Sequence, residues 1–244
     1  MSKQLDWDSI DGIVLDAVGT LIKPTPSVAD AYAEAAARQG VELAAGDVRA
    51  RFRAAFGDDS IQGDRGIYST DEEVERRRWR AIVAGVLPEV PDPDGAFDEL
   101  WDHFGRPEAW RCFPDAAPAV EAILEAGLRV RIGSNFDSRL RGVIAGLPEL
   151  APIADDPVIS SEVGFRKPHR SFFGAVVDRF DLPPERILSV GDDLENDVLG
   201  ARRAGVRALY LDRGGELPGG VESVPDLLAL IEGRAGTLKF GGRV

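Results

Sequence analysis

Four polar residues of this sequence follow apolar runs or precede a helix, and their side chains suit phosphoryl transfer: Asp16, Ser134, Lys167 and Asp192. A carboxylate can act as a nucleophile and form an aspartyl-phosphate, which divides one difficult step into two. Because that carboxylate must approach an anionic phosphoryl group, a divalent cation on oxygen ligands is expected to offset the repulsion. Asp16 and Asp192 are the natural ligands of the cation, while Ser134 and Lys167 can hold the non-bridging oxygens.

Strands and helices are expected to alternate in the two parts of the chain that carry these residues. The predicted strands are Gly12–Leu15, Leu128–Ile132, Val158–Ser160, Arg186–Val190 and Ala208–Leu211. The predicted helices are Ala116–Ala126, Ser138–Ile144, Ser171–Phe180, Val198–Ala204 and Leu227–Ile231. This alternation favours an α/β fold with a doubly wound parallel sheet. Ligands of such sheets bind at the carboxyl ends of the strands, so we expect the four polar residues to meet at one edge.

The segment between the first two strands has a purely helical pattern. Ser27 can cap a first helix, Asp47 a second, and Thr70 with Glu73 fits the capping box of a third. A fourth helix is predicted over Asp94–Phe104. An insert of about ninety residues is too long for an ordinary loop. The sequence therefore predicts a helical cap domain over residues 24–112, inserted into a core domain of residues 1–23 and 113–244.

Composition limits the partners of this chain. The 244 residues carry a formal net charge of −13, which repels nucleic acid and anionic lipid, so neither is an expected partner. A phosphate site must then be positive locally, and the chain has few lysines besides Lys167. No apolar run approaches the ~20 residues of a membrane span, and no signal peptide is predicted. Cys112 is the only cysteine, which is compatible with a reducing cytoplasm, and we expect it to be a packed residue.

Four segments, in this order, resemble the motifs of the haloacid dehalogenase-like superfamily. The first is DAVGTL, which begins at Asp16; Ser134 resembles the Ser/Thr of the second motif and Lys167 the lysine of the third. The sequence Gly191–Asp192 followed by Asp197 resembles the fourth. The match spans roughly residues 12–212, and the helical insert stands where the superfamily has its type-one cap. The runs SNFDSRL and GDDLENDVLGA are most similar to the rhythmically expressed gene product-like branch, also known as domain-containing haloacid dehalogenase-like hydrolases.

The resemblance implies a Rossmann-like core, a Mg²⁺ ion and a small phosphorylated substrate, with Asp16 as the nucleophile. It also implies that Mg²⁺ is held by Asp16, the backbone carbonyl of Val18 and Asp192. Asp197 would hold metal-bound water, with Asp193 as a further candidate. The resemblance places Asn135 beside the nucleophile. It carries no expectation about the oligomeric state.

Val18 is the departure from the family pattern. Phosphatases of the superfamily usually have a second Asp two residues after the nucleophile, which protonates the leaving alcohol and then activates water. Valine can do neither, and general acid–base catalysis is worth ~10²–10⁴-fold in rate. A phosphatase of this kind is therefore expected to be slow or narrow, unless the proton comes from the substrate or the cap. The candidate cap residues are Asp58, Asp59, Asp64, His103 and Glu108.

Three other functions remain open at this point. A 2-haloacid dehalogenase lacks the second Asp and releases a halide that needs no proton, but it uses no metal and lacks the Gly191–Asp192 pattern. A phosphonoacetaldehyde hydrolase needs a cap lysine, and residues 25–111 contain none. A weakened protein that binds a phosphorylated ligand would be expected to lose site residues at random, whereas here only the Val18 position departs.

Side chains of the helical insert are expected to be structural. The aromatic residues recur at helical spacings and are predicted to form the insert's own core. Arg76, Arg77 and Arg78 are predicted to lie on a solvated helix face. Binding of a second anionic group of the substrate by these arginines is the alternative.

Overall fold

The computed structural model describes residues 6–57, 68–215 and 221–232. A six-stranded sheet in the order β5-β4-β1-β6-β7-β8 forms the centre of the molecule, and all of its neighbouring strands are parallel. The strands are β1 (Gly12–Leu15), β4 (Arg129–Ser134), β5 (Val158–Ile159), β6 (Ile187–Gly191), β7 (Arg207–Leu211) and β8 (Ser223–Val224). Every residue of β1 and β6 is buried, as expected for strands covered on both faces.

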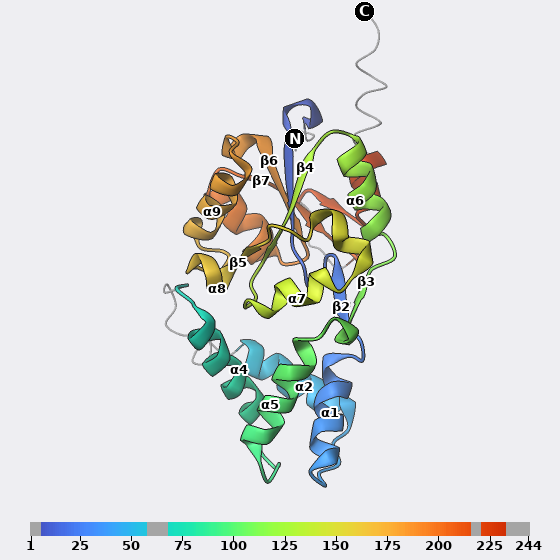
Figure 1. Ribbon diagram of the computed structural model, residues 1–244, viewed down its shortest axis with the longest axis vertical. Coiled ribbons are helices and arrows are strands. Elements are labelled where there is room, and N and C mark those ends of the chain that lie inside the picture. Colours follow the sequence, from blue (N-terminus) through green and yellow to red (C-terminus); the bar gives the residue numbers. More distant parts are fainter. Residues whose placement is uncertain (1–5, 58–67, 216–220, 233–244) are drawn as a thin grey trace, which may run out of the picture.

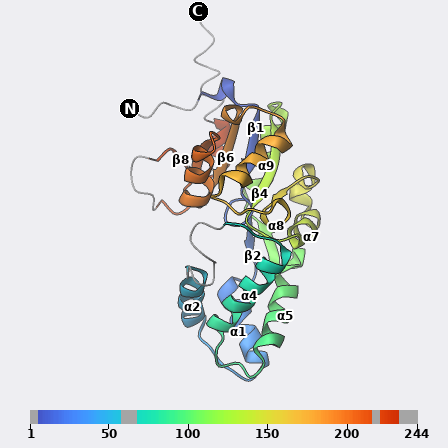
Figure 2. The same cartoon turned by 90° about the vertical axis from the view of Figure 1, so that its left-hand side faces the viewer.

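Helices cover both faces of the sheet, as Figures 1 and 2 show. Side chains alternate along β1, so Ile13 and Leu15 pack in one apolar cluster and Val14 in another. The first cluster includes α6 (Ala116–Glu125) and α7 (Arg139–Ala145); the second includes α9 (Arg170–Phe180) and α10 (Gly200–Arg203). The short helices are η1 (Trp7–Ser9), η2 (Pro107–Ala109), η3 (Pro148–Ile153), α8 (Ser160–Val163), η4 (Pro184–Arg186) and the π-helix η5 (Leu194–Leu199). The predicted doubly wound α/β fold is confirmed.

Among the described residues between β2 and β3, four α-helices form a separate group at one end of the molecule (Figure 1), called the helical block below. They are α1 (Val28–Arg38), α2 (Ala45–Gly57), α4 (Glu72–Val86) and α5 (Pro93–Phe104). The block has its own apolar cluster, in which Tyr32, Ile82 and Phe97 are fully buried. Phe52, Trp79, Trp101 and Phe104 are partly buried and pack against this cluster, as their spacing predicted. Phe56 was expected there too, but it is 39% exposed.

Two three-residue strands, which the sequence pattern did not indicate, join the helical block to the sheet. β2 (Ile22–Pro24) pairs antiparallel with β3 (Trp110–Cys112), so the chain enters and leaves the block on neighbouring strands. Cys112 faces Ile22 in this pair and is partly buried, and burial raises the pKa of its thiol to about 11. The division into a core and a cap at residues 23/24 and 112/113 stays a prediction, and both boundaries fall at this pair.

Helix capping differs from the prediction at α2 and at α4. α2 begins at Ala45, so Asp47 lies in its first turn and is not its N-cap. The N-cap of α4 is Asp71, whose carboxylate accepts a hydrogen bond from the backbone N–H of residue 74 at 2.7 Å. The Thr70 hydroxyl donates instead to Glu75 Oε1 at 2.7 Å, so the proposed box of Thr70 with Glu73 is wrong. Two residues that can both cap stand side by side here, and only the packing of Glu75 decides between them. At α1 the predicted cap Ser27 is confirmed, because its hydroxyl accepts from the N–H of residue 30.

Candidate active site

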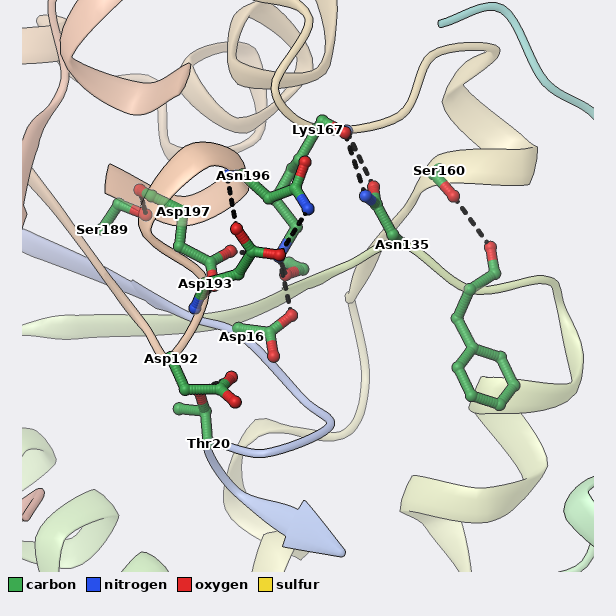
Figure 3. Close-up of polar contacts among 12 residues, drawn as sticks. Asp16, Thr20, Asn135, Ser160, Lys167, Ser189, Asp192, Asp193, Asn196 and Asp197 are labelled. Carbon is green, nitrogen blue, oxygen red and sulfur yellow. Dashed lines mark hydrogen bonds and ion pairs between the residues drawn. The ribbon is translucent and has the colours of Figure 1, made fainter. Parts of the chain in front are cut away.

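The carboxyl ends of β1, β4 and β6 bring several polar side chains together (Figure 3). Asp16 directly follows β1, and Asp192 directly follows β6. Lys167 comes from the segment between α8 and α9, and its Nζ lies 2.6 Å from Asp16 Oδ1 and 2.6 Å from Asp197 Oδ1. The same Nζ donates to the carbonyl of Gly133 at 2.9 Å. Lys167 therefore spans the first and fourth motifs at the edge where the sheet binds ligands.

Three carboxylates lie together here, and two of them, Asp16 and Asp197, contact the Lys167 ammonium group. Oxygens of Asp16, Asp192 and Asp197 lie within 4.8 Å of one another. Burial, partly offset by Lys167, raises the pKa of Asp16 to about 8. Burial and the charge of Asp197 raise the pKa of Asp192 to about 6. The pKa of Lys167 is raised because the charges of Asp16 and Asp197 outweigh its burial.

The chemistry of this cluster fits a hard divalent cation. The donors are carboxylate oxygens, and their combined charge exceeds that of the one lysine. Burial is the main cause of the raised pKa values of Asp16 and Asp192, and the neighbouring carboxylates raise them further. A divalent cation would supply the missing positive charge. Asp16 and Asp192 would hold it, as the sequence predicts.

The carboxylate of Asp197 is already engaged on both oxygens. Oδ1 pairs with Lys167, and Oδ2 accepts a hydrogen bond from the Asp193 N–H at 3.1 Å. Asp193 is engaged as well, since it accepts hydrogen bonds from two N–H groups of η5 and from the side chain of Asn196. Asp193 thus shapes the turn that presents Asp197, and a role for either residue with metal-bound water stays a prediction.

Glycines make room for two of the carboxylates. Gly19 has φ +94°, and a Cβ at this position would lie 2.1 Å from Asp192 Oδ2. A Cβ on Gly191 would lie 2.1 Å from Asp197 Oδ2. Both distances are far below van der Waals contact, so the approach of these acids depends on the missing Cβ atoms.

Replacement of Gly19 by Ala should therefore damage the site more than the fold. The methyl group would push Asp192 away, and the positive φ would add roughly 1–2 kcal/mol of backbone strain. We expect Mg²⁺ affinity, measured by titration calorimetry, to fall at least ~10-fold while the unfolding temperature falls by only a few degrees. Gly215→Ala is the matched control: it also has a positive φ, but a Cβ there meets nothing within 4 Å. Equal Mg²⁺ affinity in both variants would exclude Asp192 as a ligand.

Val18 lies in the loop between Asp16 and β2. The Gly19 N–H donates to the carbonyl of Ile22, and the carbonyl of Ala17 accepts from the N–H groups of residues 21 and 22. The Val18 side chain is 37% exposed and offers neither a donor nor an acceptor. Val18 therefore provides no acid–base group two residues after Asp16. The role of the Val18 carbonyl as a metal ligand stays a prediction.

Ser134 and Asn135 have different surroundings. Ser134 is the last residue of β4 and is buried beside β5, where it pairs with Ile159. The Asn135 side chain accepts from the Lys167 N–H at 2.7 Å and donates to the Lys167 carbonyl at 3.0 Å. Asn135 thus acts on the candidate nucleophile through Lys167, whose backbone it holds.

Arg213 stabilises the loop after β1. The sequence pattern did not indicate this role of Arg213. Its Nη2 donates to the Thr20 carbonyl at 2.8 Å, and its Nη1 lies 3.0 Å from Asp115 Oδ2. The guanidinium also lies 4.1 Å from the centre of the Phe113 ring. One arginine beyond the last long strand gives no sequence signal for such a role, because its partners are distant in the chain.

The helical block contacts the sheet layers through Glu72 and Trp101. Glu72, in the first turn of α4, accepts hydrogen bonds from the N–H and hydroxyl of Ser138, both at 2.9 Å, and from the Ser161 hydroxyl at 2.5 Å. Arg139 lies 3.3 Å from the centre of the Trp101 ring. These contacts attach α4 and α5 to the sheet layers.

The three consecutive arginines of α4 differ in their exposure to solvent. Arg76 and Arg77 are exposed and form ion pairs with Asp98 and Glu73. Arg78 is only 6% exposed, so its predicted place on a solvated face is wrong. A run of three arginines does not fit on one face of a helix, because successive residues differ by about 100°.

The candidate proton donors of the block gain no support from the structure. Asp58, Asp59 and Asp64 lie outside the described residues. His103 packs against Phe104, and Glu108 is exposed. In the part of the chain that the structure describes, the charged groups that shift the pKa of Asp16 are Lys167, Asp192 and Asp197.

Comparisons with known proteins agree with this site and fold. The family model for the haloacid dehalogenase-like hydrolases matches residues 10–205. Haloacid dehalogenase-like hydrolase domain-containing protein 3 of Danio rerio is 28% identical over 208 residues, covering 82% of this chain and 84% of that protein. The phosphoserine phosphatase of Thermus thermophilus is 28% identical over 236 residues, covering 88% and 93%.

A solved dehalogenase structure shares the fold, with a TM-score of 0.72 and 22% identity over 91% of this chain and 96% of that one. Among the described residues, no helix has both the length and the apolar character that a membrane crossing requires. The family model spans most of the chain, including the segments that carry Asp16, Lys167 and Asp192. This protein therefore belongs to the haloacid dehalogenase-like hydrolases, in the branch that its motifs indicated.

Proposed function

We propose that this protein is a Mg²⁺-dependent phosphatase that hydrolyses a small phosphorylated metabolite through an aspartyl-phosphate at Asp16. The observation that carries the proposal is the cluster of Asp16, Asp192 and Asp197 around Lys167. A phosphatase needs this concentration of oxygen ligands to hold a cation. A dehalogenase does not need a cation, because its substrate carries no phosphoryl group. The similarity to the phosphoserine phosphatase of Thermus thermophilus supports the same choice.

The covalent steps start at Asp16. An oxygen of Asp16 attacks phosphorus, the bond from phosphorus to the leaving oxygen breaks, and the leaving oxygen takes the bonding electrons. Because Val18 cannot donate a proton, the leaving oxygen takes one from solvent water. Water then attacks the aspartyl-phosphate, which releases inorganic phosphate and restores the Asp16 carboxylate. Bound Mg²⁺ would supply positive charge between Asp16 and the phosphoryl group. Lys167 favours the ionised form of Asp16, 2.6 Å away, and Ser134 is the proposed partner of a phosphoryl oxygen.

The helical block is proposed to be the cap of this site, covering residues 24–112 over a core of residues 1–23 and 113–244. Its attachment through Glu72 and Arg139 would exclude water around the aspartyl-phosphate. Because Val18 cannot donate a proton, substrates with good leaving groups should react fastest. Aryl and acyl phosphates belong to this class.

Hydrolysis of p-nitrophenyl phosphate tests the proposal directly. We expect phosphate release with Mg²⁺ that stops in excess EDTA and returns when Mg²⁺ is restored in excess. Mg²⁺ at 100 times its dissociation constant should also stabilise the folded protein by about 2.7 kcal/mol, which a thermal unfolding curve measures. Ca²⁺ in place of Mg²⁺ is the control for binding without productive geometry.

A parallel assay of halide release from 2-chloropropionate separates the other candidates. Halide release that persists in EDTA would make the protein a dehalogenase and would refute the metal assignment at Asp192. Mg²⁺-dependent binding of a phosphorylated ligand without any product would instead identify a binding protein. Either result would contradict the proposed phosphatase.

A further inference from the structure

A buried polar cluster lies between the helical block and the sheet layers, apart from the three carboxylates. Glu75 of α4 is 1% exposed, and its Oε1 accepts a hydrogen bond from the Thr70 hydroxyl at 2.7 Å. Arg78, one helical turn further along α4, places Nη1 3.6 Å from Glu75 Oε2. Arg166, from the segment before α9, places Nε 3.5 Å from Glu75 Oε1. Two guanidinium groups thus share one carboxylate, and both ion pairs are long.

Counted over the described residues, the cluster has positive charge and hydrogen-bond donors in excess. Within the described residues, Nε and Nη2 of Arg78 and Nε of Arg166 are buried and have no hydrogen-bond partner. A buried charged donor without a partner is costly, because it has lost its water. Burial and the neighbouring charge of Arg166 lower the pKa of Arg78 to about 10, so Arg78 still carries its charge at neutral pH. One further negative charge would balance the cluster.

The position of the cluster connects it with the candidate active site. Arg166 directly precedes Lys167, whose Nζ contacts Asp16. The N–H of Arg166 donates to the Tyr68 carbonyl at 2.8 Å, and the Thr70 N–H donates to the Gly164 carbonyl at 3.0 Å. A group bound between Arg78 and Arg166 would therefore contact both the helical block and the segment that carries Lys167.

We propose that Arg78 and Arg166 form an anion subsite that binds a carboxylate of the substrate, so that the substrate is a small phosphorylated carboxylic acid. The planar fork of a guanidinium matches a carboxylate in a bidentate geometry. The local excess is a single positive charge, which a monoanionic carboxylate balances better than a dianionic phosphate. This inference rests on the proposed phosphatase function and specifies its substrate class.

A matched pair of substrates tests the inference. Phosphoglycolate and ethyl phosphate have the same two-carbon skeleton, but only phosphoglycolate has a carboxylate. We expect the native protein to favour phosphoglycolate in kcat/KM by ~10–100-fold, the effect of a charged hydrogen bond. Arg78→Gln should remove most of this preference, chiefly through KM. Arg77→Gln, one residue away but exposed, should retain it.

A second readout does not depend on turnover. Glycolate should raise the unfolding temperature of the native protein and of Arg77→Gln, but not that of Arg78→Gln. If Arg78→Gln does not fold, Arg78→Lys keeps the charge, loses the fork, and should lose at least half of the preference. Stabilisation by glycolate without any phosphatase activity would support the subsite and refute the proposed function. An unchanged substrate preference in folded Arg78 variants would overturn the subsite while leaving the phosphatase standing.

Discussion

Asp16→Asn should lower the phosphatase kcat by at least ~10⁴-fold, because an amide cannot take the place of the carboxylate nucleophile. Asn is nearly isosteric with Asp, so the loss should come from chemistry and not from a cavity. Lys167 keeps its contacts with Asp197 and the Gly133 carbonyl, which leaves the neighbouring site in place. Single-turnover measurements with p-nitrophenyl phosphate would quantify the loss.

The same variant should be more stable than the native protein in the absence of metal. The pKa of Asp16 is raised to about 8, so its charged form opposes folding. The native protein therefore loses stability as the pH rises from about 4 to about 8, whereas the Asn variant has no such loss at this position. The gain in unfolding temperature should be larger at pH 8 than at pH 5, in EDTA.

Asp98→Asn, on the exposed face of α5, is the control and should alter neither the phosphatase activity nor the unfolding temperature. Retention of more than ~1% of the activity by Asp16→Asn would refute the nucleophile assignment.

Val18→Asp should raise the hydrolysis of alkyl phosphates by ~10²–10⁴-fold, because it restores a general acid–base two residues after Asp16. The Val18 side chain is 37% exposed, so a carboxylate there keeps much of its hydration and should not unfold the loop. The gain should be small for p-nitrophenyl phosphate, whose leaving group needs little protonation. A large difference between the two substrates would identify proton transfer as the missing step.

The measurement is kcat/KM for ethyl phosphate and p-nitrophenyl phosphate in the native protein, Val18→Asp and Val18→Asn. Val18→Asn is matched in size and polarity but cannot exchange a proton, so it should stay near the native rate. A flat response of Val18→Asp would mean that the proton comes from another group or that access of water limits the reaction. An equal gain in Val18→Asn would assign the effect to polarity.

Five of the six strands of the sheet could be predicted because they depend on local patterns, whereas the two-residue strand β8 is too short to give one. Apolar runs such as Gly12–Leu15 have one stable environment, a buried strand, and the polar residue that follows each run marks the carboxyl end. The order of the four motifs then indicated which residues meet, and the structure brings Asp16, Lys167 and Asp192 together.

Other features could not be predicted because they depend on contacts between distant segments. The meeting of Arg78 with Arg166, 88 positions later in the chain, depends on how the helical block packs on the sheet layers, which the sequence pattern does not indicate. The burial of Arg78 itself agrees with its place one turn before the buried Ile82, which the run of three arginines obscured. Glu72 resembles any acidic residue in a first helical turn until Ser138 and Ser161 are placed beside it. The β2–β3 pair is too short for a periodic signal.

That pair of short strands also bears on how such a molecule can evolve. The chain departs at Ile22–Pro24 and returns at Trp110–Cys112, on hydrogen-bonded neighbours, so the ends of the helical block are held a strand's width apart. A helical insert of another size or sequence could therefore connect β2 and β3 without altering the strands that present Asp16 and Asp192. Catalysis and substrate specificity can therefore evolve independently. The sheet retains the catalytic residues, and replacement of the helical block changes the specificity.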